Sequence, residues 1–299
     1  MGAGVSFSLR DLGNSASTVA SLAGMSRELS QLVRRMNISA MGVLNFARHL
    51  GVSTNTLATA FKVMNAALKQ QSYIEWMTFL GAVLINKQSR IDFVNEVHNM
   101  EYLTTIIVQT HLHGDPEARP HVSSTDHCRV FPVSAIRSHS PHQDFDGAVD
   151  VVYTLRMNGD KLRVLLSSTM AVMVFVGAAK PDAPMKPYDL CERSFMTDYE
   201  DTCNATLTNG RKIYDHRNKY AYVTFRNGGH RYFAAYESDE SLTEKLGRYV
   251  QTFSDGWAIF EVQRDVWKSC LENDYIRLEL IAVNARYNTS STLTASHGR

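Results

Sequence analysis

The sequence predicts an α+β protein in which a helical N-terminal segment is followed by an antiparallel β-sandwich of jelly-roll type. Two observations support this fold class. Residues 25–100 carry apolar side chains at the spacing of helices, whereas residues 101–287 carry short runs rich in β-branched and aromatic residues. In addition, Asn158-Gly159 and Asn227-Gly228-Gly229 have the composition of tight hairpin turns. Residues 1–24 and 288–299 are assigned to terminal arms.

The sandwich prediction centres on residues 150–178. Apolar and more polar side chains alternate up to Asn158-Gly159 and alternate again afterwards, so a hairpin of two antiparallel strands is expected. Residues 170–176 are almost wholly apolar, which is typical of a strand buried on both faces. The alternating apolar positions are Val151, Tyr153, Leu155, Met157, Leu162, Val164 and Leu166.

Length and composition set broad limits. The 299 residues suffice for a large core, and a net charge of +1 gives no long-range attraction to nucleic acid or anionic membranes. The four cysteines lack CxxC spacing, so we expect reduced thiols in a cytosolic setting. The longest apolar run, 170–179, is about half as long as a membrane-spanning helix needs, and the N-terminus lacks the pattern of a secretory signal.

Residues 25–100 are expected to form a small helical bundle or arm. Apolar side chains at helical spacing and a serine before the first of them indicate the helix starts. The predicted helices begin near Ser26, cover 41–50, 54–69 and 73–85, and end with a segment starting near Ser89.

Residues 44–62 also allow a helix-turn-helix. Ala47 would lie at the helix crossing, Gly51 in the turn and Leu57 in the core. The face that would read DNA bases offers mainly threonine and asparagine, with only Lys62 positive, whereas DNA readers surround such a face with arginine and lysine. A helix-turn-helix used for packing is therefore favoured over one that binds nucleic acid.

From Glu101 onward the pattern changes to strands. Three prolines mark a loop over 179–188, because proline is excluded from central strands. Ser241-Leu242-Thr243-Glu244 has the pattern of a capping box and predicts a helix to about Phe253. The predicted strands cover 102–113, 128–136, 149–157, 162–166, 170–176, 220–225, 231–236, 257–262 and 275–283.

The first residues suggest lipid attachment. Gly2 is followed by small uncharged residues and Ser6, which fits the N-myristoylation pattern; a plain Gly/Ser terminus is the alternative. The opening GAGVSFSL resembles the myristoylated ends of viral structural proteins, namely the small internal capsid protein of picornaviruses and the minor capsid proteins of polyomaviruses. The resemblance covers less than a tenth of the chain. It implies that Gly2 is acylated and that the N-terminal arm interacts with membranes.

Six of the eleven histidines fall between residues 111 and 142. Two rings in a His-x-His strand share one face and could bind a metal, and imidazoles that titrate near pH 6.5 could instead form a pH switch. Loop histidines without a joint role are the third interpretation and the favoured one. The pH-switch candidates are His111, His113, His121, His127, His139 and His142.

Aromatic and arginine side chains are densest around the second hairpin signal. They suit subunit contacts or base stacking, although the core and rim of a sandwich explain most of them. The interface candidates are Tyr222, Arg226, Arg231, Tyr232 and Phe233.

The sequence shows no Ser-His-Asp spacing, phosphate loop or paired-carboxylate motif, so an enzyme is not expected, and neither a cofactor nor a bound metal is predicted. The resulting hypothesis is a self-assembling capsid protein of a virion, with an acylated, membrane-interacting N-terminus and locations in the host cytoplasm and at its membranes. The alternatives are an acylated matrix or adaptor protein and a nucleic-acid-binding protein that uses residues 44–62.

Overall fold

The computed structural model describes residues 3–7, 24, 26–46, 52–70, 76–84, 87–111, 128–137, 144–159, 161–177, 183–202, 210–250, 255–265 and 277–284. The chain divides into two compact units, and each is described by itself. Unit 1 comprises residues 1–109 and 147–165, and unit 2 comprises residues 110–146 and 166–299.

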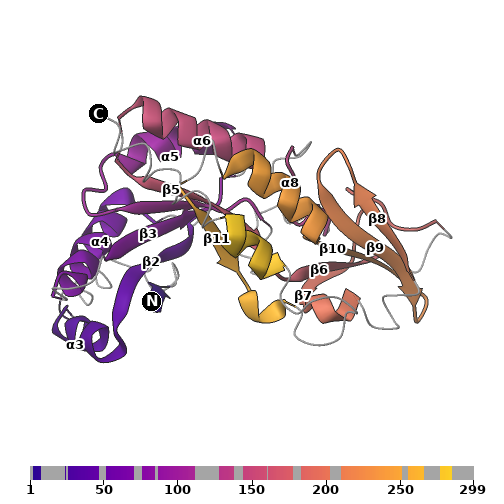
Figure 1. Ribbon diagram of the computed structural model, residues 1–299, viewed down its shortest axis with the longest axis horizontal. Helices are drawn as coiled ribbons and strands as arrows, with labels where there is room; N and C mark the ends of the chain where they lie inside the picture. The colour runs from indigo at the N-terminus through magenta and orange to yellow at the C-terminus, as the bar shows by residue number, and fades with distance from the viewer. Residues whose placement is uncertain are drawn as a thin grey trace. The chain divides into compact units, whose positions relative to one another are not determined.

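Unit 1 is built from strands that alternate with helices (Figure 1). Its strands lie in sequential order, and the pairs β1–β2, β2–β3 and β3–β4 are parallel. Sequential parallel strands connected by helices are the arrangement found in the wall of a β/α barrel. The strands are β1 (Ala3–Phe7), β2 (Ile38–Phe46), β3 (Met77–Ala82), β4 (Thr105–Val108) and the start of β5 (Arg163–Thr169); the helices are α3 (Ser26–Met36), α4 (Thr54–Leu68) and α5 (Lys87–Val97).

Helix α4 shows why the helical predictions succeeded in part of unit 1. Ser53 is its N-cap, and the Ser53 hydroxyl accepts a hydrogen bond from the Thr56 amide at 3.2 Å. The buried side chains recur every three or four residues, so one face of the helix packs on β2 and β3. The predicted helices near Ser26, at 54–69 and near Ser89 are confirmed as α3, α4 and α5.

The helices predicted at 41–50 and 73–85 are wrong, because β2 and β3 occupy these parts of the chain. Met41, Gly42 and Val43 are consecutive in β2 and therefore alternate between its two faces, and all three are buried. A parallel strand covered on both faces has neither the helical nor the alternating apolar pattern, so it resembles a buried helix in sequence. The predicted helix-turn-helix at 44–62 is also contradicted, since residues 44–46 belong to β2.

The hairpin predicted around Asn158-Gly159 is wrong: the residues before Asn158 form a helix, and Asn158-Gly159 ends it. Helix α6 (Phe145–Met157) buries Ala148, Val151, Val152 and Leu155, which is helical spacing, while Tyr153 and Met157 are 62% and 68% exposed. Gly159 adopts a φ of +77° and its amide donates to the Arg156 carbonyl at 3.0 Å. Glycine with positive φ commonly ends a helix, and the same residue type also forms hairpin turns.

Unit 2 contains the end of β5 paired in parallel with β11 (Trp257–Phe260), and a separate five-stranded antiparallel sheet. The antiparallel sheet is inserted in the sequence between β5 and β11 (Figure 1). Its strands, in sheet order, are β7 (Arg193–Thr197), β6 (Val172–Gly177), β10 (His230–Tyr236), β9 (Tyr220–Asn227) and β8 (Arg211–Asp215). The remaining elements are the short helices η2 (Tyr199–Thr202) and η3 (Val262–Arg264), helix α8 (Asp239–Tyr249) and a helix over 277–284.

The prediction of a jelly-roll sandwich is therefore wrong, although one hairpin and six of the nine predicted strands are confirmed; the six correspond to β4, β5, β6, β9, β10 and β11. Strand β6 corresponds to the apolar run at 170–176, and Asn227-Gly228-Gly229 connects β9 to β10. The strand predicted at 275–283 falls in the helix 277–284, and the strand predicted at 149–157 falls in α6. The α8 cap is Ser238 rather than Ser241, because the Ser238 hydroxyl accepts from the Ser241 amide.

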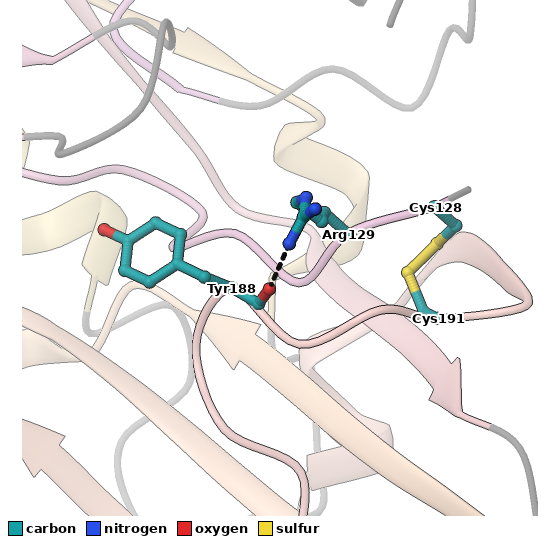
Figure 2. The surroundings of a disulfide bond; sticks show 4 residues. All are labelled: Cys128, Arg129, Tyr188 and Cys191. Atoms are coloured by element: carbon teal, nitrogen blue, oxygen red, sulfur yellow. Dashed lines mark hydrogen bonds between the residues drawn. A yellow bond between two sulfur atoms is a disulfide. The ribbon is translucent and has the colours of Figure 1, made fainter. Parts of the chain in front are cut away.

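One face of the antiparallel sheet packs on residues 128–136 through an apolar cluster that contains a disulfide (Figure 2). The bond joins Cys128 to Cys191, and the Arg129 guanidinium donates to the Tyr188 carbonyl at 3.0 Å beside it. This contradicts the expectation of reduced thiols for these two cysteines. Cys203 and Cys270 lie outside the described residues. Of the helices described, none is both long enough and apolar enough to span a bilayer.

Candidate functional site

The carboxyl-terminal ends of β5 and β11 meet in unit 2, next to the residues that follow β4. Ligands of α/β proteins bind at the carboxyl ends of parallel strands, because the loops and side chains there are free to vary while the sheet stays fixed. The side chains at this edge are polar or aromatic: Thr110, His111, Ser167, Ser168 and Phe260, joined by Trp257, which begins β11 and hydrogen-bonds to Ser168. We call this group the strand-end cluster.

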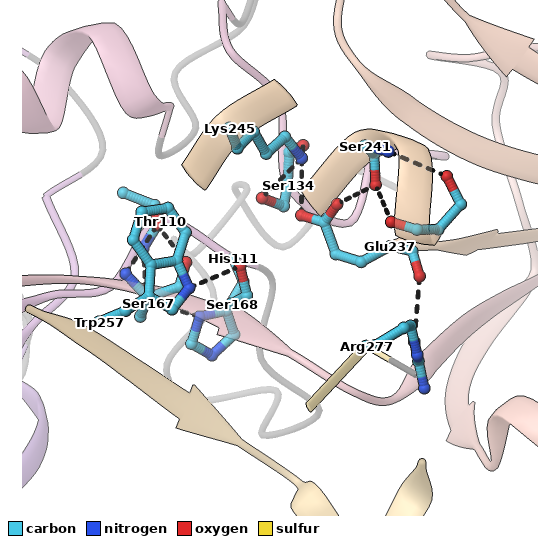
Figure 3. A network of polar contacts seen from close by, with 11 residues as sticks. Thr110, His111, Ser134, Ser167, Ser168, Glu237, Ser241, Lys245, Trp257 and Arg277 are labelled. Carbon is cyan, nitrogen blue, oxygen red and sulfur yellow. Dashed lines mark hydrogen bonds and ion pairs between the residues drawn. The ribbon is translucent and has the colours of Figure 1, made fainter. Parts of the chain in front are cut away.

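Hydrogen bonds fix the polar half of the strand-end cluster (Figure 3). The Thr110 amide donates to the Ser167 hydroxyl at 3.0 Å, and the Ser167 amide donates to the Thr110 hydroxyl at 3.2 Å. The His111 Nδ1 lies 2.8 Å from the Ser167 hydroxyl, and the His111 side chain is buried. The three residues therefore hold one another in defined rotamers rather than facing solvent as independent groups.

Aromatic rings form the other half of the cluster. The Phe260 ring centre lies 4.5 Å from that of His111, and Phe260 is partly exposed. The Trp257 indole donates to the Ser168 hydroxyl at 3.2 Å and stacks on Phe145 with ring centres 5.5 Å apart. An accessible aromatic ring beside oriented polar groups fits a ligand that has one apolar face and a polar rim.

Glu261 is a carboxylate that follows a parallel strand directly. It adopts a φ of 54°, which is uncommon for a residue with a side chain and is often found at functional sites. Its carboxylate accepts from Arg264 Nε at 3.2 Å and from the Gln263 amide group at 2.7 Å, and the residue is partly exposed. Glu261 therefore places an oriented negative charge at the edge where Phe260 ends β11.

A fully buried ion pair lies at the end of β10 (Figure 3). Lys245 Nζ is 2.6 Å from Glu237 Oε1 and also donates to the Ser134 carbonyl at 2.6 Å, while the Ser241 hydroxyl donates to the other Glu237 oxygen at 2.5 Å. Burial lowers the pKa of Lys245, and the neighbouring Glu237 carboxylate opposes that shift. Both charged groups are hydrogen-bonded, as buried charges require.

A second buried charge, Arg277, comes from the helix 277–284. Its guanidinium donates to Asp265 Oδ1 at 2.7 Å, to the Glu237 carbonyl at 3.1 Å and to the Met170 carbonyl at 2.9 Å. The guanidinium carbon also lies 3.9 Å from the centre of the Tyr199 ring. One side chain thus contacts four segments that are far apart in sequence.

Only one of the six histidines predicted as a pH switch lies in the described part of the chain, so the switch stays a prediction. His111 lies in the strand-end cluster, whereas His113, His121, His127, His139 and His142 lie outside the described residues. Among the residues that the structure describes, no group of three or more histidine, cysteine, aspartate or glutamate side chains could hold a metal ion. Gly2 also lies outside the described residues, so its acylation stays a prediction.

The interface candidates all lie on the β9–β10 hairpin of the antiparallel sheet. Phe233 is buried and Tyr222 stacks on it with ring centres 4.5 Å apart, so these two belong to the core. Tyr232 stacks on Phe225 at 4.7 Å and is partly exposed, as is Arg231, whereas Arg226 is exposed. Whether these exposed side chains contact another subunit stays a prediction.

Sequence reasoning missed the buried charges and Phe260. One signal was available for Lys245: it occupies the i+3 position between Leu242 and Leu246 on the apolar stripe of α8, where a solvated lysine is not expected. Arg277 and Phe260 gave no comparable signal, because their partners are set by the arrangement of strands and not by nearby residues.

Comparison with solved structures settles the fold. The structure is similar to an immunomodulatory chitinase from Trichuris suis, with a TM-score of 0.66 and 10% identity over 92% of this chain and 76% of that one. It is also similar to a glycoside hydrolase family 18 N-acetylglucosaminidase from Paenibacillus barengoltzii, with a TM-score of 0.61 and 12% identity over 95% and 81% of the two chains. This is a chitinase fold.

A chitinase-like agglutinin from Robinia pseudoacacia has the same fold, with a TM-score of 0.59 and 12% identity over 93% of this chain and 75% of that one. The chitinase fold overturns the predicted capsid function, the jelly roll and the virion, because the similar structures are glycosidases and a related agglutinin. It also corrects the expectation that the protein is not an enzyme. No protein-family model matches the chain, and no curated protein matches it.

Proposed function

We propose that the protein binds oligosaccharides of N-acetylglucosamine, the repeating unit of chitin, at the strand-end cluster. The observation that carries the proposal is the partly exposed Phe260 ring at the carboxyl end of β11, 4.5 Å from His111. A pyranose ring has an apolar face that packs on an aromatic ring and hydroxyl and amide groups that hydrogen-bond around it. The position of the cluster supports the proposal, because ligands of β/α barrels bind at the carboxyl ends of the parallel strands.

Hydrolysis of the same oligosaccharides is the second candidate, and Glu261 favours it. Glycosidases protonate the leaving oxygen with a carboxylic acid, and in substrate-assisted enzymes the N-acetyl group of the sugar replaces the second carboxylate. Glu261 supplies one carboxyl group directly after Phe260. Asp115 and Glu117, which follow His111 in the sequence, lie outside the described residues.

Calorimetric titration with chitopentaose tests the binding proposal. We expect saturable binding by the wild type and about tenfold weaker binding by Phe260→Ala, because the variant loses the aromatic surface. Phe195→Ala is the matched control, since Phe195 is an exposed phenylalanine on β7. Cellopentaose, which lacks the N-acetyl groups, should bind more weakly. Equal affinity of the wild type and Phe260→Ala would reject the proposed site.

Release of reducing ends from chitopentaose tests the second candidate in the same samples. If Glu261 acts as the acid, Glu261→Gln should lower the turnover number by about a hundredfold or more while leaving binding nearly unchanged. Binding by the wild type without release of reducing ends would leave oligosaccharide recognition as the function of the cluster. Release that is unaffected by Glu261→Gln would exclude Glu261 as the acid.

A further inference from the structure

Two short backbone segments connect the antiparallel sheet to the rest of unit 2. Residues 170–171 form the incoming connection, because β5 ends at Thr169 and β6 begins at Val172. Residues 237–238 form the outgoing connection, between the end of β10 and the start of α8. Any rotation of the antiparallel sheet against β5 and β11 must bend both connections.

Arg277 donates hydrogen bonds to both connections at once. One terminal nitrogen donates to the Met170 carbonyl at 2.9 Å, and the other donates to the Glu237 carbonyl at 3.1 Å. The third nitrogen donates to Asp265 at 2.7 Å, which holds the guanidinium plane in place. Arg277 is fully buried, so water does not compete for these bonds.

The antiparallel sheet contributes a further contact to the same guanidinium. Tyr199, in the short helix after β7, presents its ring 3.9 Å from the guanidinium carbon. Tyr199 in turn packs edge-on against Tyr236 at the end of β10, with ring centres 5.3 Å apart. The sheet therefore contacts Arg277 through Tyr199, which packs on Tyr236, as well as through its two connections.

We propose that Arg277 is a positioning residue that fixes the antiparallel sheet at both connections and thereby sets its orientation at the carboxyl edge of β5 and β11. The proposal rests on the proposed oligosaccharide site for its functional consequence. That consequence follows from the Met170 amide, which donates to the Phe260 carbonyl at 3.0 Å. Arg277 thus acts on the strand-end cluster through one intervening residue.

Arginine is suited to this role by its geometry. Three donors in one plane reach two carbonyls and a carboxylate simultaneously, whereas a lysine ammonium is a compact group on a flexible stem. We therefore expect Arg277→Lys to retain the buried charge near Asp265 and to lose at least one of the two backbone contacts. Arg277→Gln should lose both.

Hydrogen–deuterium exchange tests the positioning role without any ligand. In Arg277→Gln, amide exchange in peptides covering residues 170–172 and 237–239 should be about tenfold faster, while the β9–β10 hairpin keeps its wild-type protection. Arg277→Lys should show a smaller increase at the same places. The matched control is Arg248→Gln, because Arg248 is an exposed arginine that pairs with Asp146 at 3.5 Å. Uniformly faster exchange, or the same pattern in the control, would overturn the proposal.

Oligosaccharide length supplies the second readout. If a bound pentasaccharide runs from Phe260 toward the start of the antiparallel sheet, it depends on the position of that sheet, whereas a disaccharide on Phe260 does not. Arg277→Gln should weaken chitopentaose binding about fivefold and change chitobiose binding less than about twofold. An equal loss for both ligands would show a general structural role instead.

A second variant keeps the proposal testable if Arg277→Gln does not fold. Asp265→Asn removes the charge that orients the guanidinium but keeps an oxygen acceptor, so the same localised exchange pattern is expected at lower amplitude. If the wild type binds no oligosaccharide, the proposed function fails, while the exchange measurement still decides the role of Arg277. Unchanged exchange at both connections in Asp265→Asn would count against that role.

Discussion

The antiparallel sheet of unit 2 is held to its surroundings by two regions with different chemistry. On one face, the Cys128–Cys191 disulfide and an apolar cluster attach it to residues 128–136. At the ends of β6 and β10, the attachment consists of buried charges, Glu237 with Lys245 and Arg277 with Asp265. An apolar contact tolerates a change of shape, whereas a buried ion pair depends on both partners being present. The charged region therefore restricts the geometry of the attachment more tightly than the apolar region does.

The largest effect should come from breaking the Glu237–Lys245 pair. Lys245→Met leaves the Glu237 carboxylate buried without its counter-ion, so the free energy of unfolding should fall by about 3–5 kcal/mol. Urea denaturation measures this. The control is Lys219→Met, because Lys219 pairs with Glu244 at 2.6 Å near the surface and should contribute less than about 1 kcal/mol.

Removing both charges sharpens the same comparison. The double variant Glu237→Gln with Lys245→Met has no unpaired buried charge and should recover part of the loss. A double variant that is as unstable as the sum of the two single variants would show that the pair contributes only as two independent contacts.

An intermediate effect is expected from the disulfide. Replacing Cys128 and Cys191 together by alanine should lower the free energy of unfolding by about 2–4 kcal/mol, since the bond closes a long loop between residues 63 apart in sequence. Thermal melts with and without reductant, together with peptide mapping of the oxidised protein, measure the effect. Equal melting temperatures of the oxidised wild type and the double variant would show that the disulfide adds no stability and that the apolar cluster alone attaches this face of the sheet.

The smallest effect at neutral pH should come from Tyr220 in the apolar cluster. Its hydroxyl is buried, and within the described part of the chain no group hydrogen-bonds to it. Tyr220→Phe should therefore change the free energy of unfolding by less than about 1 kcal/mol at pH 7, because it removes an unsatisfied polar group. A large loss at pH 7 would indicate a hydrogen bond that the structure does not show.

The same substitution should have its main effect in alkaline solution. Burial raises the pKa of Tyr220, so the folded state retains a proton that the unfolded state loses. Stability is thus complete below the ordinary tyrosine pKa of about 10 and falls as pH rises above it. Tyr220→Phe should flatten that decline in melting temperature. The lowered pKa of Lys245 acts with the opposite sign and is common to both proteins.

The two Asn-Gly sequences show how far sequence reasoning reached in the fold. Asn227-Gly228-Gly229 was correctly predicted as a hairpin turn, with positive φ at both glycines, whereas Asn158-Gly159 ends helix α6. Both sites require a residue that tolerates positive φ, so the turn residues alone do not distinguish them. The spacing of buried residues before Asn158 does distinguish them, because it follows Ala148, Val151, Val152 and Leu155.

The parallel sheet was missed for a related reason. Strands β2 and β3 are buried on both faces, so their sequences were interpreted as helices. The prediction therefore contained no alternation of strands and helices in unit 1. The strand-end cluster could not be predicted from the sequence, since His111 and Phe260 come together only through the pairing of parallel strands. The burial of Lys245 could have been predicted, because this lysine lies on the apolar stripe of α8 and there requires a buried partner.

The central claim is that the carboxyl edge of β5 and β11 is an oligosaccharide site, and a crystal structure of the protein with chitopentaose tests it most directly. We predict a sugar ring packed on Phe260, with its polar groups directed toward the residues that follow β4 and β11. Sugar density at any other surface, with Phe260 uncovered, would contradict the claim.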